Sequence, residues 1–357
     1  MAVGTSLRGL LAFEGITLAD IEAIRLILRG QSVVDWYRLN LNTAEEVECF
    51  LRVNGYDSRM EDDERRLRHL LASAIEYLET NFYYHFPDEL KHPEAVTDVF
   101  LAASSSSEYQ NLACIVLKVA HIINHIDARE LRYRLPVSDD ALFRRAEDAV
   151  TRTVEEMVAA GAPITTFTAS RKSRDSLITK LLAKKSTIAA QVFDRLRFRI
   201  VTKTSVDLVP VLVRLKDRIL PFNYVVPGQS RNEVLPTQAA IEAVPRLNPL
   251  AHQLQYQFQL QDAGEEEDWN RFSSSDFRMI NFVVDMPLRV DEFVTDPALR
   301  DLGFLVFSLV EFQMFDEPTF EQNERGESSH DRYKDRQRWE VIRRLVYGGQ
   351  FGVGRTR

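Results

Sequence analysis

The chain has 357 residues, of which 45% are hydrophobic and 27% are charged. This balance is typical of a folded globular protein, and the length predicts about two domains. The net charge of −8 argues against a general nucleic-acid-binding protein, because such proteins need a basic surface.

The cysteine content and the apolar runs indicate the cellular compartment. Cys49 and Cys114 are the only cysteines, too few for a disulfide framework and without metal-ligand spacing. The first residues lack the long apolar core of a signal peptide, and no later apolar run is long enough to span a bilayer. We therefore expect a cytoplasmic protein that makes no membrane contact.

Residues 16–110 carry helical patterns. An amphipathic segment begins at Asp20 and ends before Gly30, a residue that terminates helices well. Thr43 precedes two glutamates and predicts the N-cap of the next helix. A run of four serines at 104–107 suggests a joint. We therefore expect an all-α N-terminal domain over residues 1–110.

Two histidines in the next predicted helix could suggest a metal site. His121 and His125 share a helix face, and Asp127 and Glu130 lie close by. No third ligand has a recognisable spacing for zinc. We interpret both histidines as packing or substrate-adjacent residues.

A basic segment follows. Lys172, Ser176 and Lys180 stand at i, i+4 and i+8, so a helix would align them on one face. Cations aligned in this way suit a polyphosphate. The alternative interpretation is a solvated basic helix.

The segment that begins at Asp194 alternates between apolar and basic residues. Leu196, Phe198 and Ile200 point one way, and the arginines between them point the other, which predicts a half-buried strand. A carboxylate at the start of such a strand suits a metal ion beside a polyphosphate. Alternatively, the charges only protect an edge strand from pairing with other chains.

Three separated patterns resemble motifs of the synthetase domain of RelA/SpoT-type alarmone synthetases. The first is Lys-x3-Ser-x3-Lys followed by Asp-x4-Arg-Ile-Val. The family usually has an arginine two residues before the first lysine; this chain has Ser170 at that position, and Arg171 is adjacent to it. The second is Glu-Phe-Gln-Met-Phe at 311–315, which follows a predicted strand from Phe304 to Val310. In this motif Phe315 stands where the family has an arginine. The third, at 324–334, keeps the family's Glu, Gly, His, Tyr and Lys.

The resemblance implies an α+β fold, with a mixed β-sheet flanked by helices as in nucleotidyltransferases. The synthetase domain would span 111–347, with an insertion at about 228–250 and a flexible tail at 348–357. Asp194 and Glu311 would hold Mg²⁺ as catalytic residues. The phosphates of ATP would contact the following residues: Arg171, Lys172, Ser176, Lys180 and Arg199.

The acceptor site departs furthest from the family. Residues 223–227 resemble its Asp-Tyr-Ile-x-x-Pro, but the following segment with a base-stacking tyrosine is missing. Tyr256 is the nearest substitute and could equally be a strand aromatic that packs on its neighbours. The residues assigned to acceptor binding are Tyr224, Tyr256, Gln313 and His330.

The resemblance implies a pyrophosphokinase that transfers pyrophosphate from ATP to the 3′-hydroxyl of a nucleotide, with GDP or GTP as the default acceptor. Two alternatives remain. One is a toxin that modifies RNA 3′ ends, against which the net acidity weighs. The other is a catalytically weakened nucleotide-binding module, which the loss of the arginine at Phe315 favours. The hydrolase motif of bifunctional family members is absent, so we do not expect alarmone hydrolysis.

Overall fold

The computed structural model describes residues 15–30, 39–183, 195–235, 244, 277–325 and 330–347. The α-helices are α2 (Leu18–Arg29), α3 (Ala44–Val53), α4 (Glu61–Phe82), α5 (Asp88–Lys91), α6 (Val96–Ser104), α7 (Gln110–Arg134), α8 (Asp139–Ala159), α9 (Arg174–Ala183), α10 (Leu208–Arg218), α13 (Glu317–Glu324) and α14 (His330–Tyr347). Short 3-10 helices are η3 (Phe222–Tyr224), η5 (Asp291–Phe293) and η6 (Pro297–Leu302). The strands are β1 (Ile164–Arg171), β2 (Leu196–Thr202), β3 (Arg231–Asn232), β4 (Ile280–Arg289) and β5 (Leu305–Asp316).

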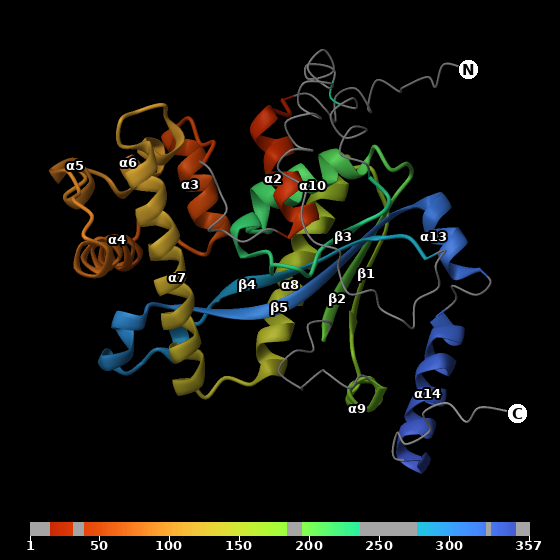
Figure 1. The fold of residues 1–357 in the computed structure, drawn as a ribbon. Helices are drawn as coiled ribbons and strands as arrows, with labels where there is room; N and C mark the ends of the chain where they lie inside the picture. Colours follow the sequence, from red (N-terminus) through yellow and green to blue (C-terminus); the bar gives the residue numbers. More distant parts are fainter. Residues whose placement is uncertain are drawn as a thin grey trace, which may run out of the picture.

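The five strands form one mixed sheet in the order β1-β2-β5-β4-β3 (Figure 1). Strands β2 and β5 pair in parallel, whereas the other neighbours are antiparallel. Helices lie on both sides of this sheet. The predicted α+β class, with a mixed sheet flanked by helices, is confirmed.

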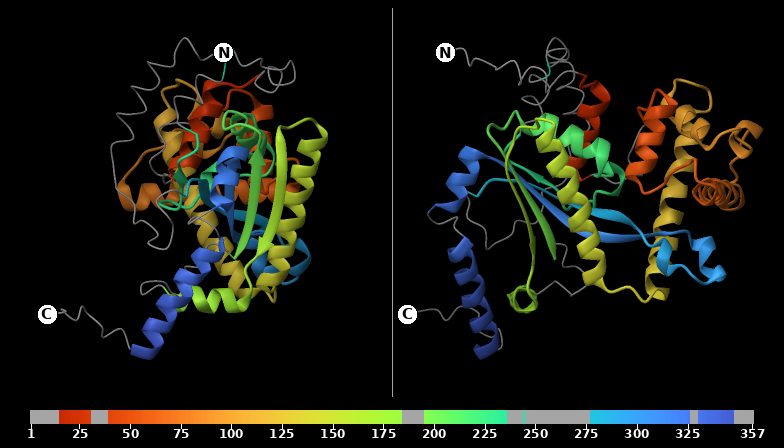
Figure 2. Two further views of the ribbon diagram at one scale, coloured as in Figure 1. Left: turned by 90° about the vertical axis from the view of Figure 1, so that its right-hand side faces the viewer. Right: turned by 180° about the vertical axis from the view of Figure 1, so that it is seen from behind.

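One face of the sheet is apolar and forms the larger core. Leu196, Phe198 and Ile200 of β2 are each 0% exposed, which confirms the predicted alternation. Phe198 lies between Phe167 of β1 and Phe312 of β5, with ring centroids 5.9 and 5.4 Å apart. Helices α2, α8 and α10 cover this face, and α8 crosses it in the view from behind (Figure 2). We call this assembly the sheet core.

A second apolar cluster, the helical core, lies among α3, α4, α6 and α7, with Leu305 of β5. Helix α7 contributes to both cores, because its early residues such as Ala113 lie in the helical core and Leu131 lies in the sheet core. Helix α2 packs in the sheet core. The division at residue 110 and the tail boundary remain predictions. None of the helices in the described ranges is long and apolar enough to cross a membrane.

The predicted end of α2 at Gly30 and the predicted N-cap of α3 at Thr43 are confirmed, whereas α2 begins at Leu18, before the predicted start at Asp20. Thr43 caps α3 by accepting a hydrogen bond from the Glu46 backbone, and Gly30 ends α2 in the left-handed conformation with φ of 59°. A Cβ atom at Gly30 would stand 2.8 Å from Ser230 Oγ, which itself donates to the Ile27 carbonyl at 2.7 Å. The end of α2 therefore needs glycine both for its conformation and for this close approach.

We expect Phe198→Ala to lower the free energy of unfolding by about 3–5 kcal/mol, because it leaves a cavity between two aromatic rings of the sheet core. Urea unfolding followed by circular dichroism measures the change. Ile126→Ala is the control, since Ile126 is 61% exposed on α7, and its effect should be much smaller. Equal losses from both variants would contradict the described packing.

Candidate functional site

The opposite face of the sheet is polar where β2 meets β5. The parallel register places Arg197 beside Glu311 and Arg199 beside Gln313. Because side chains alternate along a strand, all four point to the face opposite the sheet core. Two arginines, a carboxylate and an amide are thus gathered from segments far apart in the sequence.

Glu311 forms the centre of this group. It is only 7% exposed, and its Oε2 accepts a hydrogen bond from Arg197 Nε at 2.5 Å. Its Oε1 lies 3.4 Å from Gln313 Nε2, which donates to it. A buried carboxylate needs such partners, because desolvation of an isolated charge is costly. The predicted position at a strand end is corrected: β5 continues to Asp316, so Glu311 lies within the strand.

Arg199 is held differently from Arg197. Its guanidinium lies over the rings of Phe315 and Phe320, 5.8 and 5.6 Å from their centroids. The carboxylate of Glu324 is 3.8 Å away. Burial lowers the pKa of Arg199, and the nearby charge of Arg197 acts in the same direction. Within the described ranges, the buried Nε of Arg199 has no hydrogen-bond partner. A cation held in this way is suited to receive an anionic ligand.

The basic segment is only partly helical. Helix α9 begins at Arg174, so Lys172 precedes the helix. The backbone N–H of Lys172 donates to the Arg195 carbonyl at 2.9 Å. Of the three residues predicted to share a helix face, only Ser176 and Lys180 do so. Arg171 ends β1, where its side chain pairs with Glu147 of α8 at 2.5 Å.

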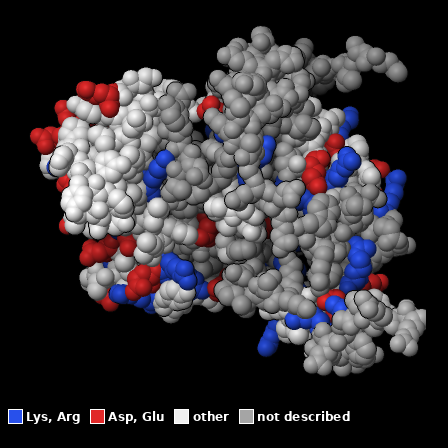
Figure 3. Space-filling view, viewed as in Figure 1, with Lys and Arg blue, Asp and Glu red and all other residues white. Residues whose placement is uncertain are grey.

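The C-terminal motif lies next to this segment. Helix α14 begins at His330 and packs against α9, as the side view on the left of Figure 2 shows. On the face seen in Figure 3, basic and acidic side chains are intermixed towards the side that bears β1, β2 and α13, and mostly acidic ones are visible along the outer edge of the helical part. Asp194, Tyr256 and the side chain of His330 lie outside the described residues. Their predicted roles remain predictions.

Sequence reasoning missed three residues on the polar face. Arg197 could have been found from the alternation, because it shares a face with Arg199. Asn281 lies opposite Gln313, and its buried Oδ1 has no hydrogen-bond partner in the described part of the chain. Asp285 lies opposite Leu309, on the same face as Glu311. The positions of Asn281 and Asp285 depend on the β4–β5 register, for which the sequence has no local signal.

The two histidines of α7 contact residues at the far end of this face. His125 Nε2 lies 2.7 Å from Asp285 Oδ2. The ring of His121 packs on Tyr224 with centroids 4.3 Å apart. Burial, with a smaller contribution from His125, lowers the pKa of His121 to about 3. The described residues contain no group of three or more His, Cys, Asp or Glu arranged to hold a metal ion.

Tyr224, predicted to bind the acceptor, is buried in the same region. Its ring also packs on Phe307 of β5 at 4.5 Å, and its hydroxyl accepts a hydrogen bond from Asn124 Nδ2 at 2.9 Å. Burial raises the pKa of the Tyr224 hydroxyl. The tyrosine therefore joins α7 to the sheet, and its role toward an acceptor remains a prediction.

No family model matches this chain, and no curated protein matches it. Solved structures with some likeness include small alarmone synthetase 1 from Bacillus subtilis, 14% identical, covering 57% of this chain and 87% of that one with a TM-score of 0.30. The same protein bound to its product pppGpp is 17% identical, with coverage of 58% and 93% and a TM-score of 0.29. A GTP pyrophosphokinase family protein from Streptococcus pneumoniae is 14% identical, with coverage of 58% and 87% and a TM-score of 0.30. Values this low leave the function to be argued from the side chains.

We expect the stability of the protein to fall as the pH decreases below about 6.5, and His121 to cause part of this fall. Its pKa is lower in the folded state, so the unfolded chain binds the proton first. The loss should reach at most about 1.4 kcal/mol per pH unit between pH 6.5 and 3.

The variant His121→Phe keeps an aromatic ring against Tyr224 and lacks the titrating group. Urea unfolding between pH 4 and 8 should give a shallower fall for the variant below pH 6.5 and equal slopes above pH 7. Identical slopes over the whole range would show that His121 titrates normally.

Proposed function

We propose that this protein is a Mg²⁺-dependent pyrophosphokinase that transfers the β,γ-pyrophosphate of ATP to the 3′-hydroxyl of a nucleotide acceptor. One observation carries the proposal: Glu311 and Gln313 share a polar sheet face with Arg197 and Arg199. Three of these four residues lie at positions of the alarmone synthetase motifs. Motif positions far apart in the chain thus meet at one place.

The arginines would bind the triphosphate. Arg199 has a desolvated guanidinium with an unsatisfied Nε among the described residues, and phosphate oxygens are strong acceptors for such a group. Arg197 is paired with Glu311 before substrate binds. When a triphosphate arrives, Arg197 would turn to its oxygens and release the carboxylate for chemistry. Further cations would come from Arg171, Lys172 and Lys180, with Ser176 as a hydrogen-bond donor.

The residues on this face are compatible with magnesium. Mg²⁺ prefers carboxylate oxygens and is commonly held by one or two carboxylates together with substrate phosphates. Glu311 presents such oxygens, and Asp194, which precedes β2, would be the second ligand. When bound, the ion would neutralise charge on the phosphates during transfer.

Glu311 would also act as the general base. It accepts the proton of the acceptor 3′-hydroxyl while that oxygen attacks the β-phosphorus of ATP. The bond between the β-phosphorus and the bridging oxygen to the α-phosphate breaks, and AMP leaves. Gln313, whose amide contacts Glu311, would orient the carboxylate and the acceptor.

The acceptor site would differ from that of the alarmone synthetases. Guanine nucleotides are the default because Glu311 and Gln313 match the family motif, and His330 and Tyr256 would complete the site. Phe315 replaces the arginine of that motif, and the Arg199 guanidinium lies over the Phe315 ring. Without a stacking tyrosine, the binding free energy of the acceptor base would be weaker by about 1–3 kcal/mol.

We therefore expect purified protein with ATP labelled in the γ-phosphate, Mg²⁺ and an acceptor panel to release AMP and label one acceptor class. The panel contains GDP, GTP, other nucleoside diphosphates and tRNA at equal concentrations. Weak or altered acceptor choice is expected, because the stacking tyrosine is missing. Strong and exclusive use of GDP and GTP would contradict that expectation. Absence of labelled product with every acceptor would refute the proposed activity.

We expect Glu311→Gln to lower turnover by about 100-fold or more, because the amide cannot accept the proton. Asp194→Ala should abolish Mg²⁺-dependent turnover. AMP release and thermal unfolding are measured together, to separate chemistry from folding. Glu321→Gln on the exposed surface of α13 is the matched control and should leave turnover unchanged. Wild-type turnover in Glu311→Gln would remove this residue from the mechanism.

A further inference from the structure

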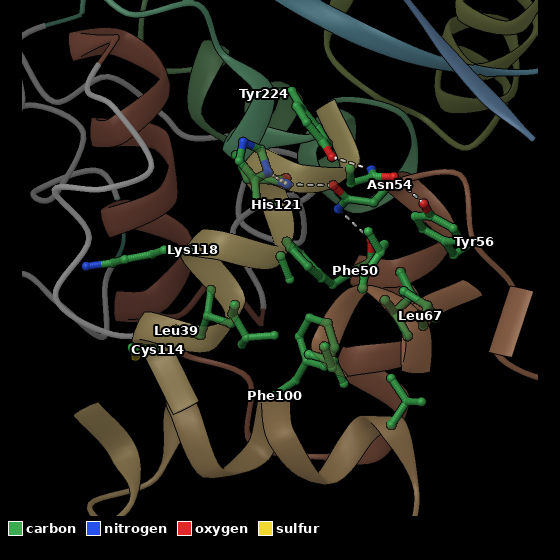
Figure 4. A pocket seen from close by; sticks show the side chains of 18 residues that line it. Leu39, Phe50, Asn54, Tyr56, Leu67, Phe100, Cys114, Lys118, His121 and Tyr224 are labelled. Carbon is green, nitrogen blue, oxygen red and sulfur yellow. Dashed lines mark hydrogen bonds between the residues drawn. The ribbon is translucent and has the colours of Figure 1, made fainter. Parts of the chain in front are cut away.

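Two cavities in the described part of the chain differ in their chemistry. The first, of about 90 Å³, lies in the helical core, and most of the side chains that line it are apolar, as Figure 4 shows. The second, of about 390 Å³, lies between α3, α8, the end of α10 and β4, and the following arginines line it: Arg52, Arg145, Arg152, Arg218 and Arg289. We call it the arginine cleft. Among the described residues that line it, only Asp148 is acidic.

Three helices supply the walls of the arginine cleft. Arg145 and Arg152 stand at i and i+7 on α8, so both lie on one face of that helix. Arg52 lies in the last turn of α3 and Arg218 in the last turn of α10. These two helix ends meet, because the sulfur of Cys49 in α3 donates to a carbonyl in the last turn of α10 at 3.1 Å, and Figure 1 shows α10 running toward α3. Arginines far apart in the sequence are thus gathered around one cleft.

The floor of the arginine cleft is apolar. In the described part of the chain, β3 pairs with only the first two residues of β4, and the edge of β4 from Met286 to Arg289 borders the cleft. Met286 and Leu288 are 4 and 6% exposed, and Val53 and Ile219 add further apolar surface. The residues of the proposed catalytic group do not line this cleft. A ligand in it would therefore occupy a different site.

Two of the arginines are held by carboxylates. Arg289 pairs with Asp63 and Asp291. Arg145 pairs with Glu292 and also donates to the Arg289 carbonyl at 2.7 Å. These two arginines are compensated within the protein, so they contribute little to the attraction of a ligand.

The other three arginines are compensated weakly or not at all. The exposed side chains of Arg52 and Arg152 have no ion-pair or hydrogen-bond partner in the described ranges. Arg218 has Glu156 at 3.6 Å, and the two side chains are 45 and 60% exposed, so this pair is weak. Cations that line one cleft from three helices create a positive local potential, although the whole chain has a net charge of −8.

A phosphate ester matches this combination of groups. The guanidinium group donates two parallel hydrogen bonds to phosphate oxygens, and several arginines together are well suited to a doubly charged phosphate. The apolar floor beside them offers contact to the carbon part of the same molecule. Small-molecule sites commonly have volumes of about 300–1,000 Å³ and combine apolar walls with a few polar groups.

We infer that the arginine cleft binds a small organic phosphate, whose phosphate group lies among Arg52, Arg152 and Arg218 and whose carbon part lies on the apolar floor. The inference goes beyond the proposed activity and does not depend on it, because the polar face of the sheet takes no part in this site.

Isothermal titration calorimetry of the full chain with phenyl phosphate tests the inference. Binding should be saturable, and inorganic phosphate should bind about tenfold more weakly, because it has no carbon part to contact the floor. Absence of saturable binding, or equal dissociation constants for the two probes, would overturn the inference.

Arginine variants locate the phosphate group. Arg52→Gln and Arg152→Gln should each raise the dissociation constant of phenyl phosphate by about five- to tenfold. Arg144→Gln is the matched control, since Arg144 is exposed on α8 and does not line the cleft. Arg199→Gln, on the polar face, should also leave the affinity unchanged. A comparable loss in either control would place the probe elsewhere or show diffuse attraction to a basic surface, and would overturn the inference.

Removal of the acidic lining residue should have the opposite effect. Asp148→Asn should lower the dissociation constant by about two- to fivefold, because it removes a like charge from the cleft. Glu155→Gln removes the same charge from α8 outside the cleft and should change little. An unchanged affinity in Asp148→Asn, or equal tightening in both variants, would contradict binding in the arginine cleft.

Discussion

The parallel pairing of β2 with β5 is the constraint on which the rest of the polar face depends. It sets Arg197 beside Glu311 and Arg199 beside Gln313. A slip of one residue in this register would turn the arginines into the apolar core and bring Phe198 to the surface. The buried aromatic contacts of Phe198 oppose such a slip. The packing of the apolar face of the sheet thus fixes which polar side chains are neighbours on the opposite face.

Charge balance on this face also explains why the arginines differ. Glu311 is too buried to remain unpaired, and Arg197 supplies the compensating charge. Arg199 instead rests on two aromatic rings, with its nearest carboxylate at 3.8 Å. An incoming polyanion would therefore find one cation ready and a second that must exchange partners. Such an arrangement keeps Glu311 paired in the folded protein, while the Arg199 guanidinium keeps its nearest carboxylate at 3.8 Å.

Local features were predictable from the sequence, whereas features that depend on distant pairing were not. The alternation from Leu196 to Ile200 and the helix end at Gly30 follow from residue patterns, and both are confirmed. The ion pair of Arg197 with Glu311 joins two segments whose register has no local signal. Lys172 lies outside α9 because the chain leaves β1 only just before it. Tyr224 is buried because α7 packs over it, which no pattern near residue 224 indicates.

The strand that carries Glu311 has its other end in the helical core, where Leu305 packs among the side chains of α3, α4, α6 and α7. Arg289, at the end of the neighbouring strand β4, is bound to Asp63 of α4. The end at which β4 leads into β5 is therefore held against these helices. A truncated chain that began near residue 111 would expose one end of its own central strand. In the full chain, amide hydrogen exchange should report these helices together with β4 and β5 as one cooperative unit, although they are distant in sequence.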